Sequence, residues 1–195
     1  MIASQDRSGW FGASDTSYIM GNWNTKTFAN WWMTKIGIRQ SHFTNEAMLA
    51  GTYYEHAILN VIGSPRKDHQ IIIPEYGLRI NLDGDGTGRI DEVKTYSYEK
   101  GFKVSNGYWQ QVQVQIFAKL WEEKTMPEAK IWAYGLQPED YNNFFNPIDR
   151  ARLKDYPIEH DSNFVNGYLF RVLYLKDCLE RGVMPDESFT MRKNT

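Results

Sequence analysis

The sequence predicts an α/β fold in which a central mixed β-sheet is flanked by helices. Three observations support this prediction. The hydrophobic residues follow a helical period up to residue 62, a strand-like pattern between residues 70 and 96, and a helical period again from residue 108. A further apolar run after that helix allows a crossover to a parallel strand. The 195 residues, 42% hydrophobic and 24% charged, are enough for one domain with one core.

The N-terminal third is predicted to be helical. A short helix over residues 16–21 can begin at a cap formed by Ser14 or Asp15. Apolar side chains recur at helical spacing over residues 27–36 and again over residues 45–62. We therefore expect two longer amphipathic helices in these segments.

Three strands are predicted next, over residues 70–74, 76–82 and 89–96, because β-forming residues there are separated by glycine and aspartate. Their short connections indicate an antiparallel meander. A helix over residues 108–123 and a buried strand over residues 130–135 follow.

The remainder of the chain is predicted to form a polar loop over residues 137–147 and a helix over residues 164–181. No stretch of linker composition interrupts the sequence. We expect a single domain over residues 1–195, with a C-terminal helical extension around residues 148–195.

Composition limits the compartment and the partners. Lysine and arginine number 22 against 24 aspartates and glutamates, so the formal net charge is -2 and binding of a polyanion would need a local groove. The single cysteine, Cys178, excludes an internal disulfide, and the charged N-terminus lacks the apolar stretch of a signal peptide. We expect a cytoplasmic protein without a membrane segment, because the apolar runs are far shorter than roughly 20 residues.

The most informative segment, residues 81–95, crowds oxygen ligands around glycines. It allows a calcium-loop interpretation, because Asp83, Asp85 and Asp91 fill the first, third and ninth positions of an EF-hand loop. Position twelve, however, is Lys94, whose charge would repel calcium, and the flanking residues are strand-like where an EF-hand needs helices. Calcium binding is therefore disfavoured.

A second interpretation treats this segment as a hairpin that holds Mg²⁺. Glu92 and Lys94 point to one side of the returning strand and Val93 to the other, and Asp83 can join them across the hairpin. Two carboxylates with a nearby ammonium suit phosphodiester hydrolysis with Mg²⁺. The simplest alternative is a solvated hairpin whose aspartates and glycines serve only the turn.

Asp83 and, nine residues later, Glu92-Val93-Lys94 resemble the catalytic signature of the PD-(D/E)XK nuclease superfamily. Further motifs accompany this signature in order along the chain: Arg7 with residues 12–15, Gly51-Thr52-Tyr53-Tyr54-Glu55, and Tyr108-Trp109-Gln110-Gln111-Val112-Gln113-Val114-Gln115. Together they resemble the phage lambda exonuclease branch, the YqaJ-like viral recombination nucleases, over residues 7–118.

The resemblance implies a restriction-endonuclease-like core and a Mg²⁺-dependent DNA nuclease, a 5′-to-3′ exonuclease at duplex ends, with Mn²⁺ as a substitute for Mg²⁺. It also implies DNA as the substrate, a single-strand annealing protein as a partner, assembly into a homo-oligomer, and the host cell cytoplasm as the location of a viral protein. The implied site consists of the metal ligands Asp83, Glu92 and the carbonyl of Val93, and of the catalytic residues Lys94, Glu55 and Gln111.

Two positions upstream, Arg7 and Ser14, resemble the residues that hold a terminal 5′-phosphate in that family, and the N–H groups at a helix N-terminus suit an anion. One departure concerns the metal: relatives read Pro-Asp-Gly where this chain has Leu82-Asp83-Gly84-Asp85, so Asp85 is an alternative ligand to Asp83. A catalytically inactive nuclease-like module that binds DNA ends or a protein is the alternative function. Gln113 and Gln115 are as readily explained as exposed helix formers.

Overall fold

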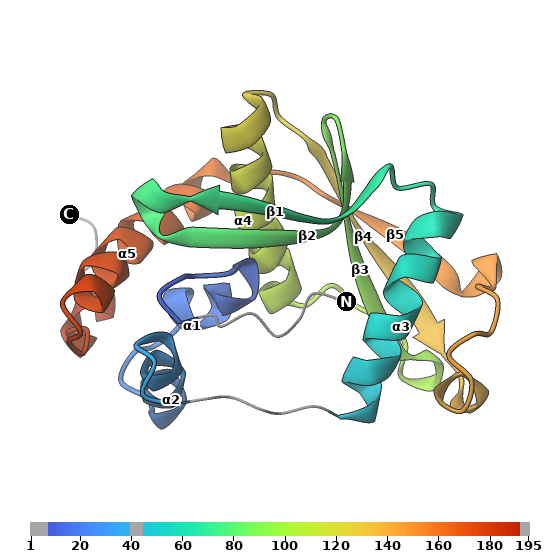
Figure 1. The fold of residues 1–195 in the computed structure, drawn as a ribbon, viewed down its shortest axis with the longest axis horizontal. Helices are drawn as coiled ribbons and strands as arrows, with labels where there is room; N and C mark the ends of the chain where they lie inside the picture. Colours follow the sequence, from blue (N-terminus) through green and yellow to red (C-terminus); the bar gives the residue numbers. More distant parts are fainter. Residues whose placement is uncertain (1–7, 40–44, 192–195) are drawn as a thin grey trace.

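The computed structural model describes residues 8–39 and 45–191. Within them lies one five-stranded sheet, in the order β1-β2-β3-β4-β5, with helices packed against it (Figure 1). This arrangement confirms the predicted α/β fold with a mixed sheet. The bounds are α1 Thr16–Met20, α2 Lys26–Lys35, α3 Glu46–Val61, β1 Arg66–Ile73, β2 Leu78–Gly86, β3 Arg89–Ser97, α4 Asn106–Glu123, β4 Glu128–Leu136, β5 Leu153–Ile158 and α5 Ser162–Glu180.

The four longest helices begin where the sequence supplies a capping side chain. Thr25, Asn45, Ser105 and Asp161 stand immediately before α2, α3, α4 and α5, and each side chain accepts a hydrogen bond from a backbone N–H of the first turn. Such caps satisfy donors that have no partner inside the helix. The predicted helices match the observed ones to within two residues at every end.

Strand pairing follows the predicted meander and crossover. β1, β2 and β3 pair antiparallel in sequence order, and α4 then returns the chain so that β4 pairs parallel with β3. The fifth strand, β5, pairs antiparallel with β4 at the edge of the sheet and was not predicted. It lies in the segment for which only helix was expected, and Pro157 within it disfavours a strand everywhere except at such an edge.

Two apolar clusters form the core on opposite sides of the sheet. In the larger one, side chains of α1, α2, α4 and α5 pack against β1, β2 and the first halves of β3 and β4. In the smaller one, Tyr54, Ile58 and Leu59 of α3 pack against Val93 of β3 and Tyr134 of β4. The sheet therefore carries α3 on one face and α4 on the other, and β3 lies between them (Figure 1).

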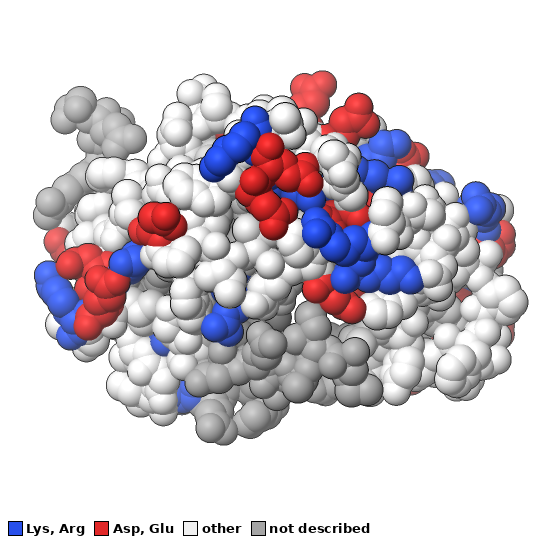
Figure 2. All heavy atoms as spheres, turned by 45° about the horizontal axis from the view of Figure 1, so that its top comes forward, with Lys and Arg blue, Asp and Glu red and all other residues white. Residues whose placement is uncertain are grey.

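Charges of both signs lie side by side on the face shown in Figure 2, and wide areas of it are uncharged. This distribution agrees with the formal net charge of -2. None of the helices among the described residues combines the length and the apolar character that a membrane span requires.

Candidate active site

The predicted ligands lie where two paired strands separate. β2 and β3 pair only through residues 84–86 and 89–91, so the pairing ends just before Asp83 and Glu92. At that point the backbone N–H of Val93 donates to Oδ2 of Asp83 at 2.8 Å, in place of a ladder partner. The side chain of Asp83 thereby bridges the two strands at the start of the gap between them.

The pairing of β2 with its other neighbour, β1, is also interrupted beside Asp83. Lys67 pairs with Gly84 and His69 with Leu82, but the intervening residue Asp68, across from Asp83, is absent from the pairing and has a φ of 55°. A left-handed backbone is uncommon outside glycine, although aspartate tolerates it better than most residues. Asp83 therefore lies on a strand that is released from regular pairing on both sides.

Glu92 is almost completely enclosed, with 1% of its surface exposed. Its Oε1 accepts hydrogen bonds from Nζ of Lys94 and from Nε2 of Gln111, both at 2.5 Å. Its Oε2 accepts one from Nε2 of Gln115 at 2.6 Å. Glu92 and Lys94 thus share the face of β3 that α4 covers, as the alternation along the strand predicted.

The local electrostatics favour binding of a cation. Burial raises the pKa of Asp83 well above its usual value, and the negative charges of Glu92 and Glu55 raise it further. Burial likewise raises the pKa of Glu55 to about 6, with added repulsion from Glu92 and Asp68. Burial alone would lower the pKa of Lys94, but Glu92 and Asp83 outweigh it and raise that pKa, so the ammonium stays charged. Three carboxyl groups around one ammonium leave an excess of negative charge.

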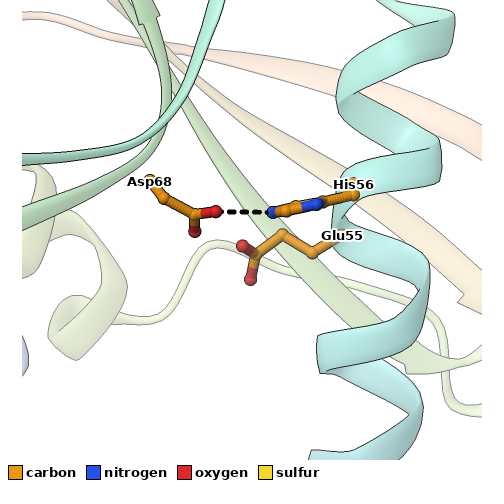
Figure 3. A group of neighbouring side chains, drawn as sticks. All are labelled: Glu55, His56 and Asp68. Atoms are coloured by element: carbon orange, nitrogen blue, oxygen red, sulfur yellow. Dashed lines mark hydrogen bonds and ion pairs between the residues drawn. The ribbon is translucent and has the colours of Figure 1, made fainter. Parts of the chain in front are cut away.

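Glu55 reaches this region because α3 lies close to β3. A side-chain carbon at Gly51, one turn before Glu55, would lie 3.3 Å from Oγ1 of Thr95 on β3, so glycine permits the close approach. On its other side Glu55 meets His56 and Asp68, and all three offer ligand atoms within 4.8 Å of one another (Figure 3). Nε2 of His56 pairs with Oδ2 of Asp68 at 2.8 Å.

Among the described residues, Glu55, His56 and Asp68 are the group of possible metal ligands whose ligand atoms all lie within 4.8 Å of one another. Glu92 raises the pKa of Glu55, and Glu55 raises the pKa of Asp83, but neither Asp83 nor Glu92 belongs to this tight group. Hard carboxylate oxygens with uncompensated charge nevertheless fit a divalent cation such as Mg²⁺ or Mn²⁺. Asp83, Glu92 and Glu55 are therefore a suitable donor set.

The alternative ligand Asp85 is already engaged by cations. It is fully buried, and its carboxylate accepts hydrogen bonds from Arg66 at 2.5 and 2.8 Å and from Lys119 at 2.5 Å, with Nδ1 of His69 at 3.0 Å. Burial alone would raise the pKa of Asp85, but these partners lower it to about 2. This balanced network favours Asp83 over Asp85 as the metal ligand. The strands on both sides of the loop also disagree with an EF-hand.

The Asp85 network gives a stability prediction. Lys119→Met leaves a buried carboxylate without its enclosed partner, and we expect the free energy of unfolding at pH 7 to fall by about 3 kcal/mol. Because the pKa of Asp85 is depressed in the folded protein, its contribution is present above the ordinary aspartate pKa and is lost as the pH falls through about 2. The difference in the free energy of unfolding between Lys119→Met and wild type, measured by urea unfolding, should shrink as the pH falls from the ordinary aspartate pKa to about 2.

Lys130→Met is the matched control, because Lys130 pairs with Asp155 on the surface, where both side chains are well exposed. An exposed pair contributes about 0–1 kcal/mol. Equal losses of stability in the Lys130 and Lys119 variants would contradict a special role for the buried network.

Of the two expected end-binding residues, only Ser14 belongs to the part of the chain that the structure describes. Ser14 is exposed in a short 3₁₀ turn, Ala13–Asp15, that contacts α4 and β2, the elements that carry Gln111 and Asp83. The following helix α1 has only five residues, and the N–H of Gly12 donates to Oδ2 of Asp15 at 2.7 Å. Arg7 lies outside the described residues.

Two glutamines of α4 differ from expectation. Gln113 and Gln115 are completely buried, so the interpretation of both as exposed helix formers is wrong. Gln113 binds the loop before α5, whereas Gln115 contacts Glu92. The four-residue spacing between Gln111 and Gln115 was the available signal, since it places both on one side of a helix.

Several solved structures share this fold. The alkaline exonuclease LHK-Exo from Laribacter hongkongensis has a TM-score of 0.68 at 20% identity over 90% of each chain, and LHK-Exo in complex with dAMP has 0.67 at 21% over the same shares. A phage related exonuclease from Haemophilus somnus 129PT has 0.60 at 15% identity over 88% of this chain and 94% of its own. No family model and no curated protein matches the sequence. These exonucleases share the fold that the resemblance implied.

Proposed function

We propose that this chain is a metal-dependent DNA nuclease, specifically a 5′-to-3′ exonuclease that hydrolyses phosphodiester bonds at duplex ends. The main support is the meeting of Asp83, Glu92 and Lys94 where β2 and β3 separate. The shared fold with exonucleases, one of them in complex with dAMP, adds to it. A calcium loop, by contrast, would need a glutamate at the position of Lys94 and helices on both flanks, where this chain has strands.

In this proposal Mg²⁺, or Mn²⁺ in its place, is held by Asp83, Glu92 and the carbonyl of Val93, with Glu55 close by. When bound, the cation would lower the pKa of a coordinated water and offset charge on the scissile phosphate. Lys94 remains protonated because of its acidic neighbours, so it acts as a cation that positions the attacking water and the phosphate, not as a base. Gln111 orients Glu92 through Oε1.

Digestion of matched DNA substrates tests the function. We expect linear duplex to be degraded in Mg²⁺ or Mn²⁺, covalently closed circles to persist, and EDTA to stop the reaction. Cleavage of closed circles would indicate an endonuclease, and DNA binding without any cleavage would favour the inactive binding module.

The same assay tests the end-binding proposal. A 5′-phosphorylated end should be degraded about tenfold faster than a 5′-hydroxyl end, because a well-made guanidinium–phosphate contact contributes roughly 1.5–3 kcal/mol. Arg7→Ala should remove most of this preference, with Ser14 as a second contact. A single-strand annealing partner and a homo-oligomer stay predictions of the resemblance.

A further inference from the structure

Gln115 lies between the two strands that carry the proposed metal ligands. Its Nε2 donates to Oε2 of Glu92 on β3 at 2.6 Å and to the backbone carbonyl of Asn81 on β2 at 3.3 Å. Asn81 precedes Asp83 by two residues on the same strand. The side chain of Gln115 therefore connects β2 and β3 where the two strands no longer pair directly.

The orientation of this amide is determined by its surroundings. A carboxylate and a carbonyl can only accept hydrogen bonds, so the donor nitrogen must face them both. Oε1 of Gln115 has no hydrogen-bond partner among the described residues, although the whole side chain is buried. An unsatisfied buried acceptor costs stability. The hydrogen bond from Nε2 to Glu92, and not packing, therefore explains why a glutamine occupies this position.

Gln115 completes the set of contacts that orient the Glu92 carboxylate. Gln111, one turn earlier on α4, holds Oε1 together with Lys94, and Gln115 alone holds Oε2 by a side-chain hydrogen bond among the described residues. Without Gln115 the carboxylate could rotate about the contacts to Oε1. Groups behind a metal ligand restrict its orientation in this way, and their loss typically weakens metal binding 10–100-fold.

We infer that Gln115 is a positioning residue, which holds Glu92 at a fixed orientation and distance from Asp83 for binding of a divalent cation. This inference rests on the proposed function and extends it to a residue to which the resemblance assigns no role. Gln115 acts through Glu92 and is itself inaccessible to substrate, since none of its surface is exposed.

The same helix offers a matched control. Gln113 is equally buried, and its amide donates to the carbonyl of Glu159 at 2.7 Å and accepts from the N–H of Asp161 at 2.8 Å. Those contacts join α4 to the start of α5, and none of the hydrogen bonds described for Gln113 reaches Glu92. Gln113→Met and Gln115→Met therefore make the same chemical change, and only the second removes a contact to the site.

The test measures Mn²⁺ binding by calorimetry on the folded, DNA-free protein, together with kcat and KM on linear duplex. We expect Gln115→Met to weaken Mn²⁺ binding about tenfold or more and to lower kcat about tenfold, with KM for DNA within about twofold of wild type. Gln113→Met should lower the melting temperature but leave Mn²⁺ affinity and kcat within about twofold. Should Gln115→Met not fold, Gln115→Glu keeps the side-chain length and replaces the donor with an acceptor.

The outcomes separate this inference from the nuclease proposal. Unchanged Mn²⁺ affinity in both Gln115 variants, or an equal loss in Gln113→Met, would overturn the positioning role even if the wild type cleaves DNA. If Gln115→Met binds Mn²⁺ more weakly than wild type and the wild type cuts no DNA, the positioning role is supported and the nuclease function alone is overturned. A wild-type protein that binds no Mn²⁺ would overturn both.

Discussion

Lys94→Ala is expected to lower kcat for DNA cleavage by about 100-fold or more, the loss typical of removing one charged group that stabilises the transition state. The ammonium of Lys94 lies 2.5 Å from Oε1 of Glu92, and only 20% of its side chain is exposed. The positive charge of Lys94 stabilises the transition state, in which the phosphate carries more negative charge, more than it stabilises the ground-state complex. DNA binding, measured with Ca²⁺ in place of Mg²⁺, should therefore stay within about threefold of wild type.

Lys130→Ala is the control for general loss of positive charge. Lys130 lies on the surface and pairs with Asp155 at 2.7 Å, and none of the ion pairs described for Lys130 reaches Glu92. We expect its kcat to match wild type within about twofold. Parallel losses of binding and cleavage in Lys94→Ala would contradict a transition-state role and indicate that Lys94 only attracts DNA.

Asp83→Asn is expected to weaken Mn²⁺ binding by about 100-fold or more, which exceeds the usual cost of changing a residue behind a ligand. The amide oxygen of asparagine can still accept the N–H of Val93, so the bridge between β2 and β3 is retained while the charge is lost. Calorimetry with Mn²⁺ measures the binding, and cleavage of linear duplex should fall in parallel.

The same variant should be more stable than wild type when metal is removed. The pKa of Asp83 is raised in the folded protein, so its contribution to stability is present below the ordinary aspartate pKa and is lost as the pH rises through the raised value. At pH 8 in EDTA we therefore expect Asp83→Asn to melt a few degrees higher than wild type. Mn²⁺ at a concentration that saturates wild type should raise the melting temperature of wild type more than that of the variant.

Asp85→Asn separates the two candidate ligands. Asp85 is engaged by Arg66 and Lys119, so its loss should lower stability and leave Mn²⁺ affinity nearly unchanged. A metal affinity that depends on Asp85 and not on Asp83 would reverse the assignment.

Local sequence alone determined most of the secondary structure. The helical spacing over residues 45–62, the capping residue Asn45 and the β-forming runs between glycines each act over a few residues, so a single sequence suffices to predict them. The alternation along β3 likewise placed Glu92 and Lys94 on one face, because the side chains of a strand alternate regardless of what surrounds them.

Tertiary structure alone decided which of these side chains meet. The edge strand β5 exists because it pairs with β4, and Gln115 contacts Glu92 because α4 covers the gap where β2 and β3 separate. Neither the burial of Gln115 nor the ion pairs of Asp85 can be predicted from neighbours in the chain. Both depend on residues 16 or more positions away, whose separation is determined only when the helices pack on the sheet.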